Sequence, residues 1–249
     1  MVVGTGIKFG LHTTPEAREC IRRADKVLYL APERLCARWI EKLNPAAVSL
    51  DGFYQPDRPR AETYRAMAEE ILSWVRRGLA VCAAFYGHPG VFVDPSHEAV
   101  KQARAEGYPA RMLPAVSSED CLVADLGFDP GTWGLQSFEA TSFLLFARRI
   151  DPTVPLLLWQ ISVVGERLGP VLPSEKGLEV LAERLGELYG PDHEVVLYEA
   201  SPYPVGKPYV ERVRLRDLTV SRVTPLCSLY APPIHEPPPD PGMYERLGI

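Results

Sequence analysis

The sequence predicts an α/β fold. Short apolar runs of strand type alternate along the chain with segments of helical periodicity, a pattern typical of β-α-β units and of mainly parallel sheets. The chain has 249 residues, of which 46% are hydrophobic and 24% charged. That length and composition suit one large domain or two smaller lobes.

The clearest element is a helix over 60–78, because apolar side chains recur along it at intervals of three and four (Tyr64, Met67, Ile71 and Val75) and Gly78 ends the pattern. A helix within 13–25 is expected to begin with Thr14 as N-cap and Pro15 at its first position. The same criteria predict further helices at 96–107, 117–127 and 176–189, and strands at 1–3, 26–31, 79–85, 110–115, 154–162, 194–200 and around 213–218. The helix at 117–127 leads to a further segment at 135–140.

The segment 113–120 is where one lobe could pass to the next. We therefore expect an N-terminal lobe at 1–115 and a C-terminal lobe at 116–232. The proline-rich tail at 233–249 cannot form a core of its own. Its apolar side chains are expected to anchor it against its own lobe or a partner subunit (Met243, Tyr244, Leu247 and Ile249).

Charge and thiols restrict the function. The net charge of −5 argues against a general nucleic-acid or anionic-membrane binder, which needs a basic face. No apolar run approaches the roughly 18 residues of a membrane span, and the first residues do not resemble a signal peptide. Five dispersed cysteines show neither C-x-x-C nor zinc-ligand spacing, so we expect a reducing, cytoplasmic location and no metal site.

A glycine pair near the start suggests a dinucleotide site but does not complete its motif. "GTG" spans Gly4 to Gly6, yet Phe9 occupies the position of the third glycine in G-x-G-x-x-G. We therefore expect no NAD(P) binding. A turn that lets the backbone approach another ligand stays open.

The segment 84–96, "AFYGHPGVFVDPS", follows a buried strand. Gly87 and Gly90 permit close backbone approach or positive φ, Pro89 fixes the path between them, and Asp94-Pro95 can cap the next helix. A tight strand-to-helix loop and a ligand-holding turn both explain it. His88 has no partner at metal-ligand spacing, which favours a hydrogen-bonded loop residue.

Two further groups also have two interpretations. Ser117 and Asp120 can form an ordinary capping box, or they can lie at a ligand site at a strand's carboxyl end. Arg60 and Tyr64 lie four residues apart on one helix face, with Tyr54 shortly before them. Tyr64 also fits the apolar stripe as a core residue, whereas together the three side chains could stabilise an anion or deprotonate a weak acid.

Taken in order, "GTGI", "YGHPGVF" and "PAVSSED" resemble the tetrapyrrole-methylase superfamily of S-adenosylmethionine (SAM)-dependent methyltransferases, with Ala115 where glycine is commoner. Long stretches around "FYGHPGVFVDPSHEAV", together with Arg60, Thr63 and Tyr64, are similar to one branch, the borosin peptide-backbone α-N-methyltransferases. The resemblance covers most of 2–232. It implies two α/β lobes with a SAM cleft between them.

The resemblance also implies roles for individual residues. Tyr54, Arg60 and Tyr64 match the proposed catalytic set. The residues matched to the SAM site are Tyr86, His88, Val91, Phe92, Ser117, Ser118, Gln160, Tyr198 and Ser228. SAM would be the methyl donor and S-adenosylhomocysteine (SAH) the product, with no metal needed.

An amide nitrogen is a poor nucleophile, because its lone pair is delocalised into the carbonyl. Methylation requires loosening the N–H proton while the oxygen's developing charge is stabilised. A tyrosine whose pKa is lowered by a nearby arginine could take the proton. The sequence does not say which tyrosine does so.

One departure from the fungal branch members concerns the substrate. Those proteins carry it as a C-terminal extension, whereas this chain ends about 17 residues after "YAPP" without an apolar core peptide. We therefore expect a separately encoded precursor peptide methylated in trans, and a homodimer as in similar enzymes. The alternatives are a small-molecule, tetrapyrrole-type methyltransferase and a non-catalytic SAM-binding regulatory protein.

Overall fold

The structure is a computed structural model that describes residues 1–168 and 174–249. The chain folds into two compact units, each described separately below. The first holds Met1–Leu126 together with Arg167, Leu168 and Ala200–Pro208, and the second holds the other described residues. The segment 116–126, assigned to the second lobe from the sequence, thus packs as part of the first unit.

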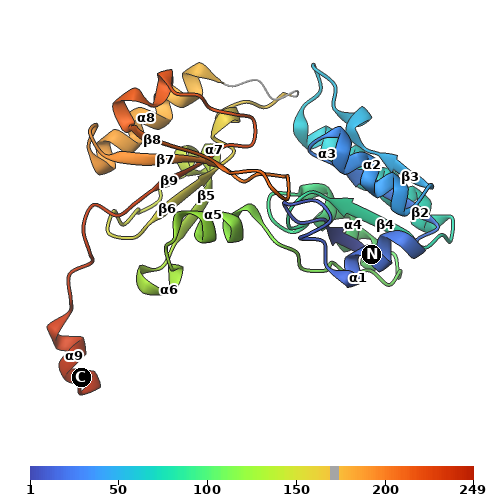
Figure 1. Ribbon diagram of the computed structural model, residues 1–249, viewed down its shortest axis with the longest axis horizontal. Helices are drawn as coiled ribbons and strands as arrows, with labels where there is room; N and C mark the ends of the chain where they lie inside the picture. Colours follow the sequence, from blue (N-terminus) through green and yellow to red (C-terminus); the bar gives the residue numbers. More distant parts are fainter. Residues whose placement is uncertain (169–173) are drawn as a thin grey trace. The chain divides into compact units, whose positions relative to one another are not determined.

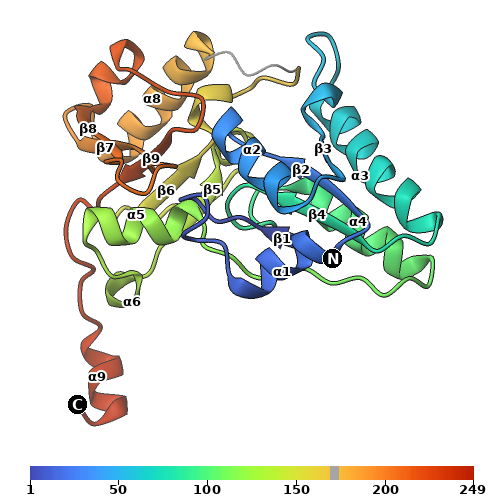
Figure 2. The same ribbon diagram turned by 45° about the vertical axis from the view of Figure 1, so that its right-hand side comes forward.

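The first unit is a parallel sheet covered by helices on both faces (Figures 1 and 2). Its strand order is β1-β4-β2-β3, and all three pairings are parallel. The strands are β1 (Val2–Gly4), β2 (Lys26–Leu30), β3 (Ala47–Ser49) and β4 (Val81–Phe85). The helices are α1 (Pro15–Arg23), α2 (Arg34–Leu43), α3 (Arg60–Arg76), α4 (Asp94–Ala105) and α5 (Ser118–Leu126), with a 3₁₀ turn η1 at Asp51–Phe53.

Alternation along the central strand β4 explains the two helical layers. Val81, Ala83 and Phe85 pack with α3 and α4, whereas Cys82 and Ala84 face the cluster that contains α1 and α2. All five residues are buried, as expected of a strand covered on both sides. The Thr14 cap is confirmed, since its side chain accepts from the Ala17 amide at 3.1 Å.

The second unit has a mixed five-stranded sheet of order β5-β6-β9-β7-β8. Its strands are β5 (Gln136–Glu139), β6 (Leu156–Trp159), β7 (Glu194–Glu199), β8 (Tyr209–Arg214) and β9 (Ser228–Ala231). Its helices are α6 (Pro130–Trp133), α7 (Ala140–Leu145), α8 (Glu175–Tyr189) and α9 (Pro241–Leu247), with 3₁₀ turns η2 (Ile161–Val163) and η3 (Leu215–Val220). Leu181 and Leu185 of α8 pack in one cluster with Leu158 and Leu197 of the sheet.

Several expectations for these elements were wrong. The second sheet is mainly antiparallel, because only β5 and β6 pair in parallel, and antiparallel neighbours need no crossover helix. The predicted strand 110–115 is reduced to a bridge between Met112 and Val2, and the one around 213–218 lies earlier, at β8. Asp94 opens α4 inside its first turn and does not cap it, since Val93 is the cap residue. The elements α2, β3, α6, α7, β9 and α9 were not predicted.

Candidate cofactor and catalytic site

Three glycine and serine segments meet at the carboxyl ends of β1 and β4. The Gly6 amide donates to the Gly87 carbonyl at 3.3 Å, and the Gly87 amide donates back at 3.1 Å. A Cβ placed on Gly4 would lie 2.5 Å from the Ala115 Cβ and would also collide with the Gly87 carbonyl. The "GTG", "YGHPG" and "PAVSS" segments therefore touch, and Gly4 is needed because nothing larger fits between them.

The 86–92 turn is held by its own hydrogen bonds. His88 Nδ1 accepts from the Gly90 amide at 3.0 Å, which confirms the loop role predicted for His88. Gly87 has φ +70° and Phe92 has φ +55°. Val91 and Phe92 are 38% and 43% exposed, so the turn presents apolar side chains to solvent. Tyr86 and His88 are half-buried within it.

Ser117 forms the predicted capping box at the start of α5. Its hydroxyl accepts from the Asp120 amide at 3.2 Å and donates to Asp120 Oδ2 at 2.7 Å, while the Ser117 amide donates to the same oxygen at 2.6 Å. Ser117 is buried and Ser118 half-buried. Because the Ser117 side chain is already engaged at both its donor and its acceptor, any ligand contact there would have to use a remaining lone pair.

The two tyrosines of the predicted catalytic set meet in the first unit. Tyr54 follows η1 and Tyr64 lies in the second turn of α3, with ring centroids 6.5 Å apart and an edge-to-face angle of 89°. Arg60 is the first residue of α3, and its amide donates to the Arg167 carbonyl at 3.0 Å. The Arg60 side chain hydrogen-bonds Tyr64. The structure thus brings all three side chains together.

Charges and hydrogen bonds act differently on the two phenols. Burial raises both pKa values, and the Tyr64 and Asp51 charges raise that of Tyr54 further. For Tyr64, the positive charge of Arg60 opposes the burial effect and lowers the pKa. The hydrogen bond between the phenols raises the pKa of Tyr54 and lowers that of Tyr64. Burial is the largest influence on the pKa of Tyr64 and raises it, whereas Arg60 and the hydrogen bond from Tyr54 act in the opposite direction.

Three predicted cofactor residues belong to the second unit. Gln160 follows β6 with a left-handed backbone, φ +56°. Tyr198 and Ser228 are paired across β7 and β9, and both are buried, at 0% and 2% exposure. The other predicted site residues belong to the first unit. The SAM cleft that the resemblance implies stays a prediction.

Backbone conformation singles out two of these residues. Among the residues at 1–168 and 174–249, Phe92 and Gln160 are the non-glycine residues with positive φ. Such conformations cost free energy and are concentrated at functional sites. Both were selected from sequence as cofactor residues, although no local pattern indicated their backbone conformation.

Two carboxylates near the phenols were not found from sequence. Asp51 raises the pKa of Tyr54 and Asp94 raises that of Tyr64. Asp51 reaches this position through η1 and Asp94 through the start of α4, so no spacing pattern connects them to the tyrosines. Within the described part of the chain, no cluster of three or more metal-ligating side chains occurs, and the five cysteines are free thiols.

A family model for Tetrapyrrole (Corrin/Porphyrin) Methylases matches residues 1–218. The chain belongs to that family, which confirms the predicted superfamily and the methyltransferase class. In the described residues, no helix has both the length and the apolar character to cross a bilayer.

Two relatives are similar in sequence over most of this chain. The chain is 39% identical over 239 residues to a methyltransferase/ribosomally synthesized type I borosin cyclic peptide precursor of Coprinopsis marcescibilis, covering 93% of this chain and 61% of that protein. It is 40% identical over 238 residues to the dendrothelin A precursor protein of Dendrothele bispora, covering 94% and 57%. The chain thus spans about 60% of the length of the curated relatives it matches.

Solved structures share the fold at lower identity. The uroporphyrin-III-C-methyltransferase of Thermus thermophilus matches with a TM-score of 0.66 and 22% identity, covering 99% of this chain and 97% of that one. A structure of the uroporphyrin-III C-methyltransferase from the same organism complexed with S-adenosylhomocysteine matches with a TM-score of 0.62 and 21% identity, covering 94% and 96%.

Proposed function

We propose that this protein is a SAM-dependent α-N-methyltransferase that methylates backbone amides of a separately encoded precursor peptide, in trans. The observation that carries the proposal is the Tyr54–Tyr64 pair beside Arg60. A permanent cation and a second phenol around one hydroxyl suit the removal of a weakly acidic proton. The names of the relatives, which join a methyltransferase to a cyclic peptide precursor, support a peptide substrate.

The first unit suits a nucleoside-type cofactor in two observed respects. The backbones of Gly6 and Gly87 hydrogen-bond to each other where the loops converge, and the 86–92 turn presents the apolar Val91 and Phe92. We propose that Tyr86, His88, Val91, Phe92, Ser117 and Ser118 bind the cofactor from this unit, and Gln160, Tyr198 and Ser228 from the other. Bound SAM would supply an activated methyl group on a sulfonium.

The roles of the chain's own residues follow from their electrostatics. We propose that the Tyr64 phenolate accepts the amide proton, that Arg60 stabilises this phenolate, and that Tyr54 remains protonated and donates to it. The amide nitrogen then forms the new N–C bond to the methyl group, and the electron pair of the broken C–S bond remains on sulfur, giving SAH. Exclusion of water from the reacting groups would strengthen these interactions.

Mass spectrometry tests this function. The purified chain would be incubated with SAM and the peptide encoded by the neighbouring reading frame, and fragmentation would locate each added methyl group. Methyl groups on backbone nitrogens support the proposal. Methylation of a tetrapyrrole acid but not of the peptide would favour the small-molecule alternative, and SAM binding without turnover on either substrate would favour the regulatory one.

Two properties of the working protein are proposed with this function. We propose that it is a homodimer, and that it acts in the cytoplasm, where its free thiols would stay reduced. Light scattering tests the first property, since a mass near 27.7 kDa that does not change with concentration would contradict a dimer. Fractionation of cells tests the second.

A further inference from the structure

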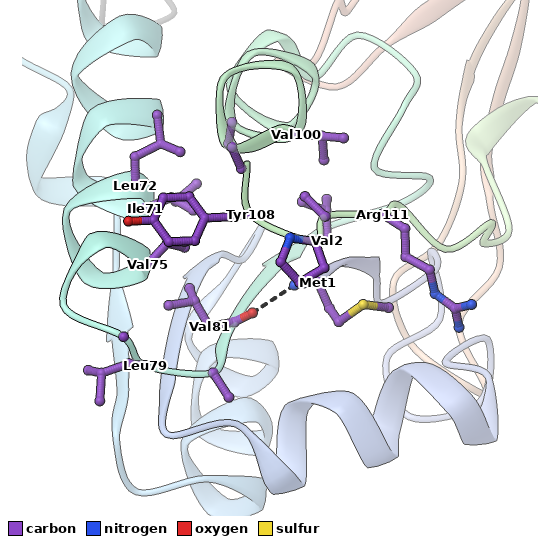
Figure 3. Close-up of a pocket in the computed structure, with 16 residues that line it drawn as sticks. Met1, Val2, Ile71, Leu72, Val75, Leu79, Val81, Val100, Tyr108 and Arg111 are labelled. Atoms are coloured by element: carbon purple, nitrogen blue, oxygen red, sulfur yellow. Dashed lines mark hydrogen bonds between the residues drawn. The ribbon is translucent and has the colours of Figure 1, made fainter. Parts of the chain in front are cut away.

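The first unit has an apolar hollow away from the glycine turns. Its volume is about 350 Å³, and it lies between the C-terminal halves of α3 and α4 and the starts of β1 and β4. Figure 3 shows the Tyr108 ring beside Ile71 and Val75. Since Met1 and Val81 line it, the hollow lies at the amino ends of these parallel strands, whereas the glycine turns lie at their carboxyl ends.

The walls of this hollow offer water few partners. Tyr108 and Arg111 are its lining residues with a polar side chain. The Met1 ammonium also lines it but already donates to the Val81 carbonyl at 2.8 Å, as Figure 3 shows. Apolar hollows hold water poorly, so an aliphatic group that enters one is stabilised by leaving bulk water.

A basic hollow adjoins the apolar one. The two share Val100 and Arg111, and the second is also lined by three residues of α4, His97, Lys101 and Arg104. These three residues lie at i, i+4 and i+7, on one helix face. The apolar hollow therefore has basic side chains along one edge.

Two cations of this edge carry a charge that their neighbours do not balance. Arg111 is paired with Glu16. In the described part of the chain, however, neither Lys101 nor Arg104 has an ion-pair partner. Arg104 Nε donates to the Ala110 carbonyl at 2.7 Å, which fixes the guanidinium and leaves its two terminal nitrogens as donors.

The carboxylates close to this row in the sequence have other partners. Glu98 of α4 accepts from the Gln102 side chain, and Glu106 just after α4 is paired with Arg76. Neither carboxylate lines the basic hollow. The row is therefore complementary to an anion supplied from outside the chain.

We propose that the paired hollows bind a medium-chain fatty acid, with its aliphatic chain in the apolar hollow and its carboxylate on Lys101 and Arg104. One molecule can occupy both hollows, because they meet at Val100 and Arg111. A carboxylate suits this row, since the terminal nitrogens of an arginine can bind both of its oxygens. An uncharged chain would leave the two cations unused, and a small anion would leave the apolar hollow unfilled.

The volume of the apolar hollow sets the length of the chain. A methylene group is similar in size to a water molecule, whose share of liquid volume is roughly 30 Å³. The hollow of about 350 Å³ therefore has room for about a dozen such groups at complete filling. Chains of about eight to twelve carbons fit this limit. Binding here needs neither SAM nor a peptide, so the proposal stands or falls separately from the proposed function.

Calorimetry on the full chain tests the apolar hollow with fatty acids from hexanoate to tetradecanoate, each below the concentration at which it forms micelles. Each further methylene that is buried should tighten binding about two- to fourfold. This gain should stop near about twelve carbons, where the hollow is full. Affinity that still rises from dodecanoate to tetradecanoate at the same rate overturns the proposal, and so does a lack of decanoate binding at millimolar concentration.

Decanol tests the basic row, because it has the same chain as decanoate and no charge. It should bind the wild type about tenfold or more weakly than decanoate does. Lys101→Gln/Arg104→Gln should weaken decanoate to a similar extent and leave decanol unchanged. Arg38→Gln/Lys42→Gln on α2 is the matched control and should change neither affinity. These two residues are also exposed and, in the described part of the chain, without an ion-pair partner.

Val75→Phe tests where the chain lies. Val75 lines the apolar hollow and is half-buried, so a larger ring there should fill part of the space and weaken decanoate and decanol alike. Lys101 and Arg104 are exposed, so the double variant should keep the melting temperature of the wild type even if Val75→Phe does not. Equal affinities for decanoate and decanol overturn the proposal. The same holds for a loss in the α2 control as large as that in the α4 variant, or for a folded Val75→Phe protein that binds decanoate as the wild type does.

Discussion

The rings of Tyr54 and Tyr64 meet edge to face, with centroids 6.5 Å apart. The hydrogen bond between the two hydroxyls raises the pKa of one phenol and lowers that of the other. The pair is therefore asymmetric, with Tyr54 as the donor and Tyr64 as the group that can lose its proton. The positive charge of Arg60 lowers the pKa of both phenols, but its side chain also hydrogen-bonds Tyr64, which lowers that pKa further.

Tyr64→Phe and Arg60→Ala should each abolish methyl transfer to the true peptide substrate while SAM affinity stays nearly unchanged, because neither side chain belongs to the glycine turns. Arg60→Lys should also be poor, since an ammonium does not reproduce the planar guanidinium fork. Single-turnover assays and calorimetry measure the two properties. Tyr209→Phe on β8 removes a phenol of the second unit and serves as the control. Wild-type rates in both Tyr64→Phe and Arg60→Ala would show that the catalytic assignment is wrong.

The rate should rise with pH. Burial raises the pKa of Tyr64, so only a minority of molecules hold the phenolate at neutral pH, and that fraction grows as pH increases. Arg60 lowers this pKa. Because Arg60→Lys retains a positive charge, its pH-rate profile should lie closer to that of the wild type than the profile of Arg60→Ala does. In Arg60→Ala any residual activity should rise only at higher pH. A pH-rate profile of the single-turnover step measures this dependence in the wild type, Arg60→Lys and Arg60→Ala. Profiles that coincide in all three proteins would exclude Tyr64 as the base.

Gly6→Ala should destabilise the first unit and remove SAM binding. Gly6 has φ +68°, and an added Cβ would collide with the His12 side chain. Gly186→Ala is the matched control, because nothing lies within 4 Å of its added Cβ and the residue is helical. There the substitution should stabilise the protein by roughly 0.5–1 kcal/mol. Thermal unfolding and calorimetry with SAM compare the two, and intact affinity in Gly6→Ala would contradict the role of this turn.

NAD(P) should not bind the wild type.

Gln160→Gly should separate stability from function. Its left-handed backbone costs a non-glycine residue about 1 kcal/mol, and glycine removes that cost. We therefore expect a higher melting temperature together with weaker SAM binding, because the side chain assigned to the cofactor is lost. An unchanged affinity would remove Gln160 from the site, whereas a lower melting temperature would show that its side chain has a structural role.

Local signals in the sequence predicted the first unit well. The Thr14 cap and the period of α3 are encoded by nearby residues, and the structure confirms both. The capping box at Ser117 is likewise local. In contrast, α2 lacks a side-chain cap at Glu33 and was not predicted.

Contacts between distant segments were harder to predict. β9 enters the second sheet between β6 and β7, which precede it in the chain, and no local pattern specifies this position. The carboxylates of Asp51 and Asp94 act on the tyrosines only after η1 and α4 have formed. The resemblance therefore indicated the proposed catalytic set, whereas the different influences on the pKa values of its two phenols depend on tertiary structure.

The discontinuous first unit has a consequence for synthesis on the ribosome. The Phe9 amide donates to the Pro202 carbonyl at 3.2 Å, and the Tyr203 hydroxyl donates to the Glu33 carboxylate. These partners are translated about 170 to 190 residues apart. The N-terminal sheet can therefore assemble early, but its last stabilising contacts wait until Ala200–Pro208 has left the exit tunnel. A nascent chain released before that point would carry the tyrosine pair on an incomplete unit.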